Sequence, residues 1–259
     1  MTDLGTLGVI FSQAFSINDR GQIVGVSSTA NGEFHAFIWQ NSVMTNLGTL
    51  GGSNSQANSI NDRGQIAGSS DTATGEIHGF LWQNGVMTDL GTLGGISSIA
   101  EGINDRGQIV GGSNPFIFDF HAFLWQNGVM TDLGTLGVGF SQANSISDRE
   151  QVVGISDTAN GENHAFLWQN GVMTDFGTLG GSNSQANSIN DRGQIVGGSE
   201  TANGETHAFL WQNGVMTNLG TLGGSFSEAF SINNHKQVVG FSDTANGEFH
   251  AFLWQMQIP

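Results

Sequence analysis

The sequence predicts an all-β protein, a six-bladed β-propeller with four antiparallel strands in each blade. A segment of 43 residues occurs six times without insertion or deletion, and each copy begins at a methionine: Met1, Met44, Met87, Met130, Met173 and Met216. Each copy contains four short runs bounded by turn residues, and no window has the periodicity of an amphipathic helix. Four strands in roughly 40–50 residues is the period of a propeller blade. We therefore expect one domain over residues 1–259.

The second copy shows the expected elements in chain order. Its first strand is expected to end at Asn61-Asp62-Arg63-Gly64, where an Asx residue starts a type I-like turn and glycine closes it. A polar loop then separates the second strand from the third. Asn84-Gly85 predicts a two-residue hairpin, because both residues tolerate positive φ. The four strands are expected at residues 55–60, 65–70, 77–83 and 86–91.

The two ends of the chain contain complementary parts of one repeat. The last copy stops at "HAFLWQMQIP", without the fourth strand that follows this motif elsewhere, and residues 1–5, "MTDLG", match the missing strand. We expect this N-terminal strand to pair with the last blade and close the ring, which would remove two exposed sheet edges. An array cut at a repeat boundary has the same pattern and would close by exchanging strands between chains.

Both faces of each sheet are expected to be buried. Ala14 and Ile17 recur at the same place in all six copies. Residues an odd number apart lie on opposite faces of a regular strand, so these two are expected to face opposite ways. Since one blade cannot bury both faces by itself, we expect the hydrophobic core to be the stack of neighbouring blade faces.

Composition excludes several classes of partner. The formal net charge is −16 with only 6 lysine and arginine residues, whereas nucleic acids and anionic membranes are bound by clustered basic residues. No apolar run approaches the roughly 18 residues of a membrane-spanning helix. The chain has no cysteine, so it has no disulfide framework, and nothing in it predicts a cofactor. We expect a monomer that binds neither nucleic acid nor a membrane.

The chain resembles the HAF-repeat family, a group of bacterial proteins described as probable extracellular repeats. The segments that carry the resemblance are "LGTLGG", "INDRGQIVG" and "HAFLWQNG", and they recur along the whole chain. The resemblance implies an extracellular or cell-surface location, although no signal segment precedes Met1, which already lies inside the first repeat. It implies no particular reaction, because the family is defined by its repeat.

Six histidines recur in register and raise the possibility of a metal ring: His35, His78, His121, His164, His207 and His250. In a six-fold ring their third strands would lie well over ~10 Å apart. Ligands that share an ion at bonds of ~2 Å must nearly touch. We therefore expect no metal. Each imidazole should hydrogen-bond within its own blade, for example to a hydroxyl such as that of Ser27, and each tryptophan of the motif should pack in the blade core.

A loop in the fourth copy, residues 157–162, has some resemblance to a calcium-binding loop. Its first position is Asp157, but Ser28, Asn114 and Glu200 occupy that position in other copies. The loop also lacks the regular alternation of oxygen ligands in an EF-hand loop. We expect a turn that starts at an Asx residue and closes with Asn-Gly; a bound calcium ion is the alternative.

Positions that differ between the copies indicate a binding surface. One position is occupied in turn by Phe11, Asn54, Ser97, Phe140, Asn183 and Phe226, and another by Phe15, Asn58, Glu101, Asn144, Asn187 and Phe230. Core positions do not alternate between phenylalanine, asparagine and glutamate, so these side chains are expected at the channel mouth or on a loop surface. The third copy also has an apolar loop at residues 113–119. The predicted ligand-binding residues are Phe11, Phe15, Asn58, Glu101, Phe116, Phe118, Phe140, Asn144, Asn187, Phe226 and Phe230.

Ring closure would bring the first and sixth copies together. Phe11, Phe15, Phe226 and Phe230 would then form an aromatic cluster beside asparagine side chains, which suits a sugar face or a protein hot spot. Filling of the closure seam is an equal alternative for these phenylalanines.

Three functions are open from the sequence. The first is a non-enzymatic binding propeller that recognises a carbohydrate or a protein surface through its long-loop face. The second is a hydrolase or lyase with a site across the channel, for which Glu101 and Glu228 are the acidic candidates, while His235 and Lys236 lie in a turn on the far face. The third is a ligand-free structural array, recently amplified or engineered, which the near-identical second and fifth copies favour.

Overall fold

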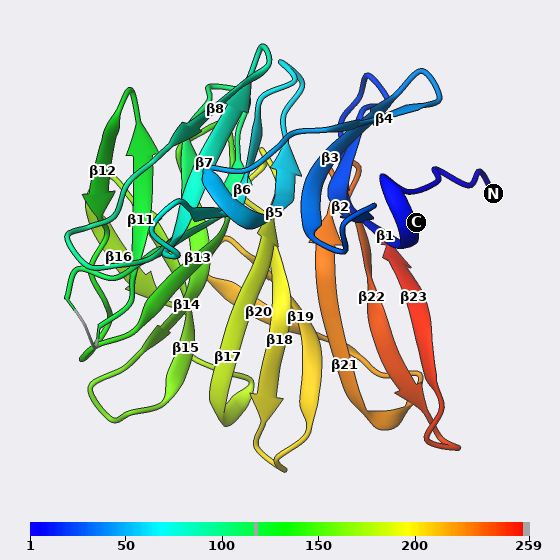
Figure 1. Ribbon diagram of the computed structural model, residues 1–259. Helices are drawn as coiled ribbons and strands as arrows, with labels where there is room; N and C mark the ends of the chain where they lie inside the picture. Colours follow the sequence, from blue (N-terminus) through cyan, green and yellow to red (C-terminus); the bar gives the residue numbers. More distant parts are fainter. Residues whose placement is uncertain (117–118, 256–259) are drawn as a thin grey trace. The chain divides into compact units, whose positions relative to one another are not determined.

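The structure is a computed structural model that describes residues 1–116 and 119–255, and in these residues it contains β-strands and no helix (Figure 1). No helix long and apolar enough to cross a membrane occurs in this part of the chain. The chain divides into two compact units, Met1–Asp132 and Leu133–Pro259. Each unit contains three of the six repeats' sheets, and each is described by itself.

The first unit contains three antiparallel sheets of four strands, each formed by strands consecutive in the chain. The strands are β1 (Gly8–Ile17), β2 (Ile23–Thr29), β3 (Phe34–Gln40) and β4 (Val43–Asn46); β5 (Gly51–Ile60), β6 (Ile66–Thr72), β7 (Ile77–Gln83) and β8 (Val86–Asp89); and β9 (Ser98–Ile103), β10 (Ile109–Ser113), β11 (His121–Gln126) and β12 (Val129–Asp132).

The second unit contains one four-stranded sheet and a larger sheet in which two repeats are joined by a parallel bridge between Thr206 and Phe226. The strands are β13 (Ser141–Ile146), β14 (Val152–Asp157), β15 (Asn163–Gln169) and β16 (Val172–Asp175); β17 (Gly180–Ile189), β18 (Ile195–Thr201), β19 (Thr206–Gln212) and β20 (Val215–Gly220); and β21 (Gly223–Ile232), β22 (Gln237–Thr244) and β23 (Phe249–Gln255). The all-β class and the antiparallel sheets are confirmed, whereas the number of blades stays a prediction.

The turns of the second repeat have the predicted chemistry. The N–H of Gly64 donates to the carbonyl of Asn61 at 3.0 Å, and Gly64 has a φ of 78°. Asn84 and Gly85 both have positive φ, 53° and 83°, as the hairpin requires. The third strand has the expected bounds, but the first begins four residues earlier than expected, at Gly51, and the fourth ends at Asp89. The turn residues therefore predicted the strand ends next to the turns more accurately than the strand ends far from them.

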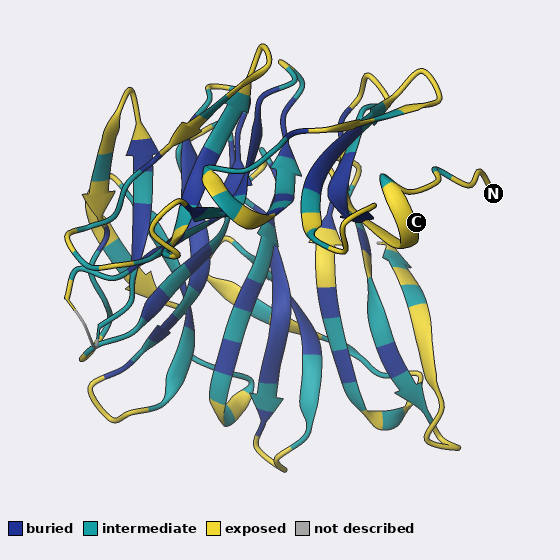
Figure 2. Cartoon of the chain, in the orientation of Figure 1, coloured by how far each residue is buried: buried dark blue, intermediate teal, exposed yellow. Residues whose placement is uncertain are grey.

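The core lies between successive sheets, as predicted. In the first unit, Val24, Ala36, Ile38 and Leu47, in or beside the first sheet, pack against four residues of the next sheet, Ala57, Ile60, Ile66 and Phe80. The same positions form the clusters of the second unit, for example Val196, Ala208 and Leu210 against Ala229, Ile232 and Val238. Figure 2 shows the buried middle strands that result. Each sheet supplies half of an interface and its neighbour supplies the other half.

The prediction that the conserved alanine and isoleucine of the first strand face opposite ways is wrong. Ala57 and Ile60 lie in the same cluster, with exposed fractions of 0% and 6%. The ladder has a bulge: Ala57 pairs with Gly68 and Ser59 with Ala67, so Asn58 is an extra residue. One extra residue reverses the alternation that follows it, which returns Ile60 to the face of Ala57.

Buried polar side chains join each sheet to the next. The Ser55 hydroxyl donates to the carbonyl of Gly48 at 2.6 Å and accepts the N–H of Ala36 at 2.9 Å. The Asn61 side chain donates to the carbonyl of Asn104 at 2.8 Å. These bonds satisfy backbone groups that the sheet ladders leave open, so the recurring serine and asparagine are structural.

The strand predicted at residues 1–5 is not formed. The first strand of the structure begins at Gly8, and among the described residues of the second unit β23 pairs only with β22. In other repeats a two-residue hairpin holds the fourth strand beside the third, and residues 1–5 have no such hairpin to place them. Leu253 on β23 is 59% exposed, whereas the equivalent Leu210 is 6% exposed.

Candidate functional site

The positions that vary between repeats gather at one end of each sheet. They lie on the first strand at Phe11, Gln13 and Phe15, on the second at Val26, and at the start of the third at Phe34, together with their equivalents at intervals of 43 residues. Grooves between neighbouring repeats are lined by these positions, one in each unit. The differences between repeats at these positions therefore change the lining of the grooves and leave the core unchanged.

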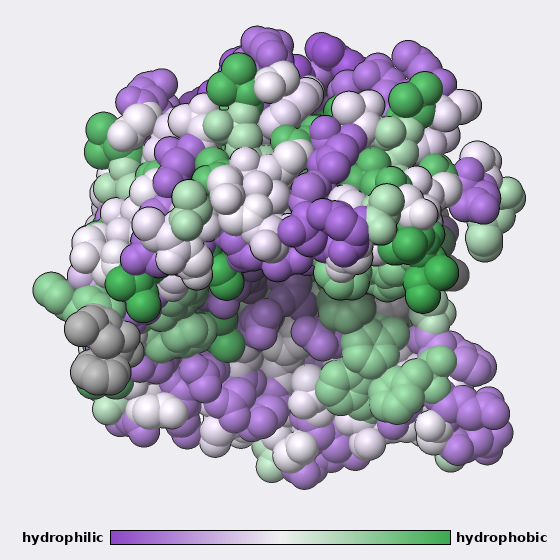
Figure 3. Space-filling model, in the orientation of Figure 1, coloured by the Kyte–Doolittle hydropathy of each residue, from purple (hydrophilic) through white to green (hydrophobic). Residues whose placement is uncertain are grey.

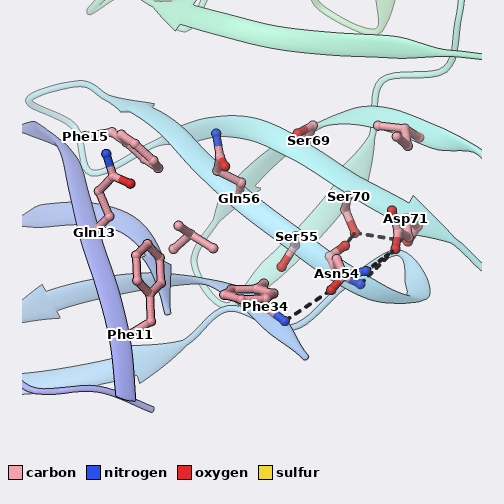
Figure 4. A pocket seen from close by; sticks show the side chains of 12 residues that line it. Phe11, Gln13, Phe15, Phe34, Asn54, Ser55, Gln56, Ser69, Ser70 and Asp71 are labelled. Carbon is pink, nitrogen blue, oxygen red and sulfur yellow. Dashed lines mark hydrogen bonds between the residues drawn. The ribbon is translucent and has the colours of Figure 1, made fainter. Parts of the chain in front are cut away.

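The groove of the first unit has a volume of about 370 Å³ and lies between the first and second repeats. Figure 4 shows phenylalanines of the first repeat on one side and Ser70 and Asp71 of β6 on the other. The residues that line it are Phe11, Gln13, Phe15, Val26, Phe34, Asn54, Ser55, Gln56, Ser69, Ser70, Asp71 and Ile77. One side is thus aromatic and the other offers amide, hydroxyl and carboxylate groups.

The aromatic side is preformed and open to solvent. The rings of Phe11 and Phe34 meet edge to face, with centroids 5.9 Å apart and planes at 76°. Phe11, Phe15 and Phe34 have exposed fractions of 42%, 41% and 44%. Edge-to-face packing fixes the ring directions, and the remaining exposed surface is free for a ligand.

The polar side is held by hydrogen bonds around Asn54. Its side-chain amide donates to Asp71 Oδ2 at 2.8 Å, and its backbone N–H donates to the same oxygen at 3.0 Å. Asn54 Oδ1 accepts the N–H of Phe34 at 3.1 Å, which ties the polar side to the aromatic side. These bonds orient the Asp71 carboxylate beside the groove, where its second oxygen can accept a hydrogen bond from a ligand hydroxyl.

The groove of the second unit has a volume of about 240 Å³ and a different lining. It is formed by Ile155, Asn163, Asn183, Ser184, Gln185, Gly198, Ser199, Glu200, Thr206, Phe226 and Glu228. The Asn183 side chain and the Ser182 N–H donate to Glu200 at 3.0 and 3.1 Å. Together these bonds lower the pKa of the Glu200 carboxyl, with the Asn183 side chain as the largest cause. This groove has two carboxylates and one aromatic ring.

An aromatic cluster lies on the last sheet of the second unit. Phe241 on β22 has ring centroids 5.2 Å from Phe226, 5.2 Å from Phe230 and 5.6 Å from Phe249. Phe230 is 51% and Phe249 63% exposed. Figure 3 shows hydrophobic side chains gathered over this sheet, at the lower right. The cluster shares Phe226 with the groove of its unit.

Three of the predicted binding residues have structural contacts between sheets. The side-chain amides of Asn58, Asn144 and Asn187 each donate at 2.9 Å to a backbone carbonyl in the following repeat. Asn58 also donates to Glu101 Oε2 at 3.2 Å, and Asn187 donates to Glu228 Oε1 at 3.0 Å. These asparagines occupy the bulge of the first strand. Their role as ligand contacts stays a prediction, and so does the catalytic alternative at the two glutamates.

The other predicted binding residues fall in several places. Phe11 and Phe15 line the groove of the first unit, and Phe226 and Phe230 belong to the cluster of the second. Phe140 is half-buried beside β13, and the Phe116 side chain is 71% exposed. Phe118 lies outside the described residues. The expected gathering of the first and last repeats' phenylalanines stays a prediction.

Five of the six recurring histidines, all except His250, hydrogen-bond to the fourth strand of their own sheet and not to the expected serine. His78 Nδ1 lies 2.9 Å from Asp89 on the fourth strand, and His35 Nδ1 lies 3.0 Å from Asn46 Oδ1. Ser27 instead accepts the N–H of Leu7 at 2.9 Å, where the chain enters the first strand. The serine is therefore used to anchor the connection between repeats, and the fourth strand supplies the partner of the imidazole.

The loop of residues 157–162 forms a hydrogen-bonded turn. The N–H of Thr158 donates to the carbonyl of Glu162 at 2.8 Å, and the N–H of Gly161 donates to that of Thr158 at 2.9 Å. No group of three or more histidine, cysteine, aspartate or glutamate side chains that could hold a metal occurs in the described part of the chain. The alternative of a calcium ion in this loop stays a prediction.

Sequence reasoning missed several residues of these grooves. Phe34, Val26 and Gln13 line the first groove, and their equivalents in the sixth repeat are Phe249, Phe241 and Glu228. A signal was present, because these positions also vary between copies, for example Phe34, Ile77, Phe120, Asn163, Thr206 and Phe249. Variation on all three inner strands, taken together, would have located the grooves.

Solved structures similar to this chain are β-propellers. The propeller domain of the Trilobed protease from Pyrococcus furiosus, which has an open velcro topology, matches with a TM-score of 0.63 and 10% identity over 95% of this chain and 82% of that chain. TolB from Acinetobacter baumannii matches with a TM-score of 0.55 and 12% identity over 90% of this chain and 63% of that chain. The chain has a β-propeller fold. At these identities the likeness shows the fold alone.

A further match is the acylaminoacyl peptidase from Pyrococcus horikoshii, with a TM-score of 0.57 and 12% identity over 94% of this chain and 43% of that chain. This chain thus spans less than two thirds of the length of that peptidase and of TolB. No protein-family model and no curated protein matches the chain. Membership of the HAF-repeat family stays a prediction from the three motifs.

Proposed function

We propose that the protein is a non-enzymatic binding module that takes a carbohydrate in the groove of its first unit. The observation that carries the proposal is the pairing of exposed phenylalanine rings with an oriented amide and carboxylate across one groove. Sugar rings have apolar C–H faces and hydroxyl rims, so their binding uses an aromatic surface beside hydrogen-bonding groups. Phe11 and Phe34 supply the surface, and Asp71 supplies an acceptor.

The size and openness of the groove support a short saccharide. A volume of about 370 Å³ lies within the range of small-molecule sites, roughly 300–1,000 Å³. The contacts among Asn54, Asp71 and Phe34 are present without a ligand, so little ordering is needed on binding.

The experiment is a glycan array followed by calorimetry of each sugar that binds. Phe15→Ala and Asp71→Asn should each weaken binding at least tenfold, about 1.4 kcal/mol of binding free energy. Phe230→Ala is the matched control, because it makes the same change at the same repeat position in the sixth repeat. The proposal fails if no glycan binds, or if the control weakens binding as much as Phe15→Ala does.

A further inference from the structure

The sixth repeat differs from the others at the groove positions. It has phenylalanine at four of them, Phe226, Phe230, Phe241 and Phe249, and no other repeat does. The rings of Phe226, Phe230 and Phe249 surround Phe241 at centroid distances of 5.2–5.6 Å. Phe249 and Phe230 keep more than half of their surface exposed. An exposed aromatic patch of this kind on a sheet is typical of an interaction surface.

The patch continues into the groove of the second unit, because Phe226 belongs to both. Glu200 and Glu228 line that groove. Glu200 is held by Asn183 and Ser182, and Glu228 by Asn187, so both carboxylates are oriented. Their hydrogen-bond donors are uncharged, which leaves the negative charges uncompensated by any residue of the lining.

A glycine makes room for the second carboxylate. A Cβ placed on Gly198 would come 3.3 Å from Cγ of Glu228, whose side chain crosses this position. In the third repeat the equivalent Gly112 is covered by the ring of Phe120, which a Cβ there would meet at 2.0 Å. The groove of the second unit therefore stays open where the third repeat is filled.

Charge complementarity defines the occupant. The basic residues of the chain are Arg20, Arg63, Arg106, Arg149, Arg192 and Lys236, and all lie in the turn after the first strand of a repeat. None of them lines the groove or belongs to the patch. An acidic groove beside exposed aromatic rings fits a cation next to an apolar group.

We propose that this surface binds a protein segment in which a lysine or arginine side chain stands beside a large apolar one. The basic side chain enters the groove between Glu200 and Glu228, and the apolar side chain packs on Phe230 and Phe249. The rings of Phe226, Phe230 and Phe249 are tilted by 31–49° to that of Phe241, so the four rings form a ridged surface that suits side chains better than a flat sugar ring.

The test uses the full chain and a labelled peptide, acetyl-Gly-Ser-Leu-Lys-Leu-Ser-Gly-amide, with a second peptide in which glutamate replaces the lysine. Fluorescence anisotropy should show saturable binding of the lysine peptide that weakens as salt rises, and no binding of the glutamate peptide. Equal binding of the two peptides, or binding of neither, would overturn the proposal.

Substituting a groove or patch residue of the sixth repeat by the residue that other repeats have at the same position tests its role without disturbing the fold. Glu228→Gln introduces the glutamine found at this position in the first, second, fourth and fifth repeats. Phe230→Asn introduces the asparagine found at its position in the second, fourth and fifth repeats. Each should weaken binding of the lysine peptide at least fivefold, while Phe15→Ala in the first unit should leave it unchanged. Unchanged binding in both sixth-repeat variants overturns the proposal. Since Phe15→Ala is the change that should weaken carbohydrate binding, the two proposals fail separately.

Discussion

The groove of the first unit and the patch of the second are formed by the same repeat positions, three of which are phenylalanine in both, whereas the fourth is Val26 in the first repeat and Phe241 in the sixth. In the first, phenylalanines of one repeat face Asn54 and Asp71 of the next. In the second, four phenylalanines share one sheet, and the adjoining groove contains two glutamates. The interface clusters are formed by the same repeat positions in both units. The same positions therefore form the core in both units, while the residues that line the grooves differ.

The largest expected effect tests whether the scaffolds of the two units are equivalent. Phe80 and Phe209 occupy the same core position, and each is fully buried. Phe80→Ala and Phe209→Ala should each lower the free energy of unfolding by about 3–5 kcal/mol. Chemical denaturation measures this, and Phe34→Ala, on the open surface, should cost far less. Clearly unequal losses at the two core positions would show that the units are not equivalent scaffolds.

A smaller effect is expected at the bulge asparagines. Asn58→Ala and Asn187→Ala remove the bond to the next sheet's backbone and leave a carbonyl without its partner, at a cost of about 1–3 kcal/mol each. Only Asn187 also orients a carboxylate of the second unit's groove, Glu228, where we propose that the peptide binds. Its substitution should therefore also weaken peptide binding, whereas Asn58→Ala should not. Loss of peptide binding in both variants would contradict this distinction.

The first repeat departs from the others in its hairpin. Ser42 has a φ of 64°, whereas the equivalent Gly85, Gly128, Gly171 and Gly214 are glycines with a φ of 81–83°. A residue with a Cβ is disfavoured by roughly 1 kcal/mol in this left-handed region. Ser42→Gly should raise the stability of the first unit by up to about that amount. A lower melting temperature for this variant would show that the Ser42 side chain makes a compensating contact.

The smallest expected effect concerns the pKa values of two carboxyl groups in the second unit, those of Asp243 and Glu200. The N–H groups of Phe226 and Ser225 donate to Asp243 and lower its pKa, with Phe226 as the larger cause; the bonds from Asn183 and Ser182 do the same for Glu200. A carboxyl whose pKa is depressed by folding stabilises the folded state above its unfolded pKa. That stabilisation is lost as the pH falls through the lower folded value.

Carbon NMR titration of the two side chains should therefore give midpoints below the ordinary range of aspartate and glutamate. Removing the largest cause for Glu200, by Asn183→Ala, should raise its midpoint and leave that of Asp243 unchanged. Ordinary midpoints in the unsubstituted protein would show that these hydrogen bonds do not persist in solution.

Much of the fold could be predicted because repetition makes the sequence redundant. Four copies of Asn-Asp-Arg-Gly and five of the Asn-Gly or Asn-Ser hairpin fix the turns, which depend on local φ preferences. The bulge at Asn58 could not be predicted, because its extra residue is visible only against the paired strand β6. The prediction that Ala57 and Ile60 face opposite ways failed for this reason.

Half of the candidate site could also be predicted. Variation located Phe11, Phe15, Phe226 and Phe230, because a residue that changes from phenylalanine to asparagine is not a core residue. It could not distinguish the asparagines of the same position, which bond to a neighbouring sheet, from the phenylalanines that stay exposed. That distinction depends on which backbone carbonyl lies within reach of a side chain, and only the packed neighbour supplies it.

The sequence by itself determined the strand composition, the turns and the positions at which the repeats differ, because these depend on local conformational preference and on periodicity. Tertiary structure decided which residues share a groove, how Glu200 and Glu228 are oriented, and that residues 1–5 form no strand. These features require pairing or contact between residues distant in the chain. Such contacts depend on the bulge, the sheet register and the space left at Gly198, none of which a local pattern specifies.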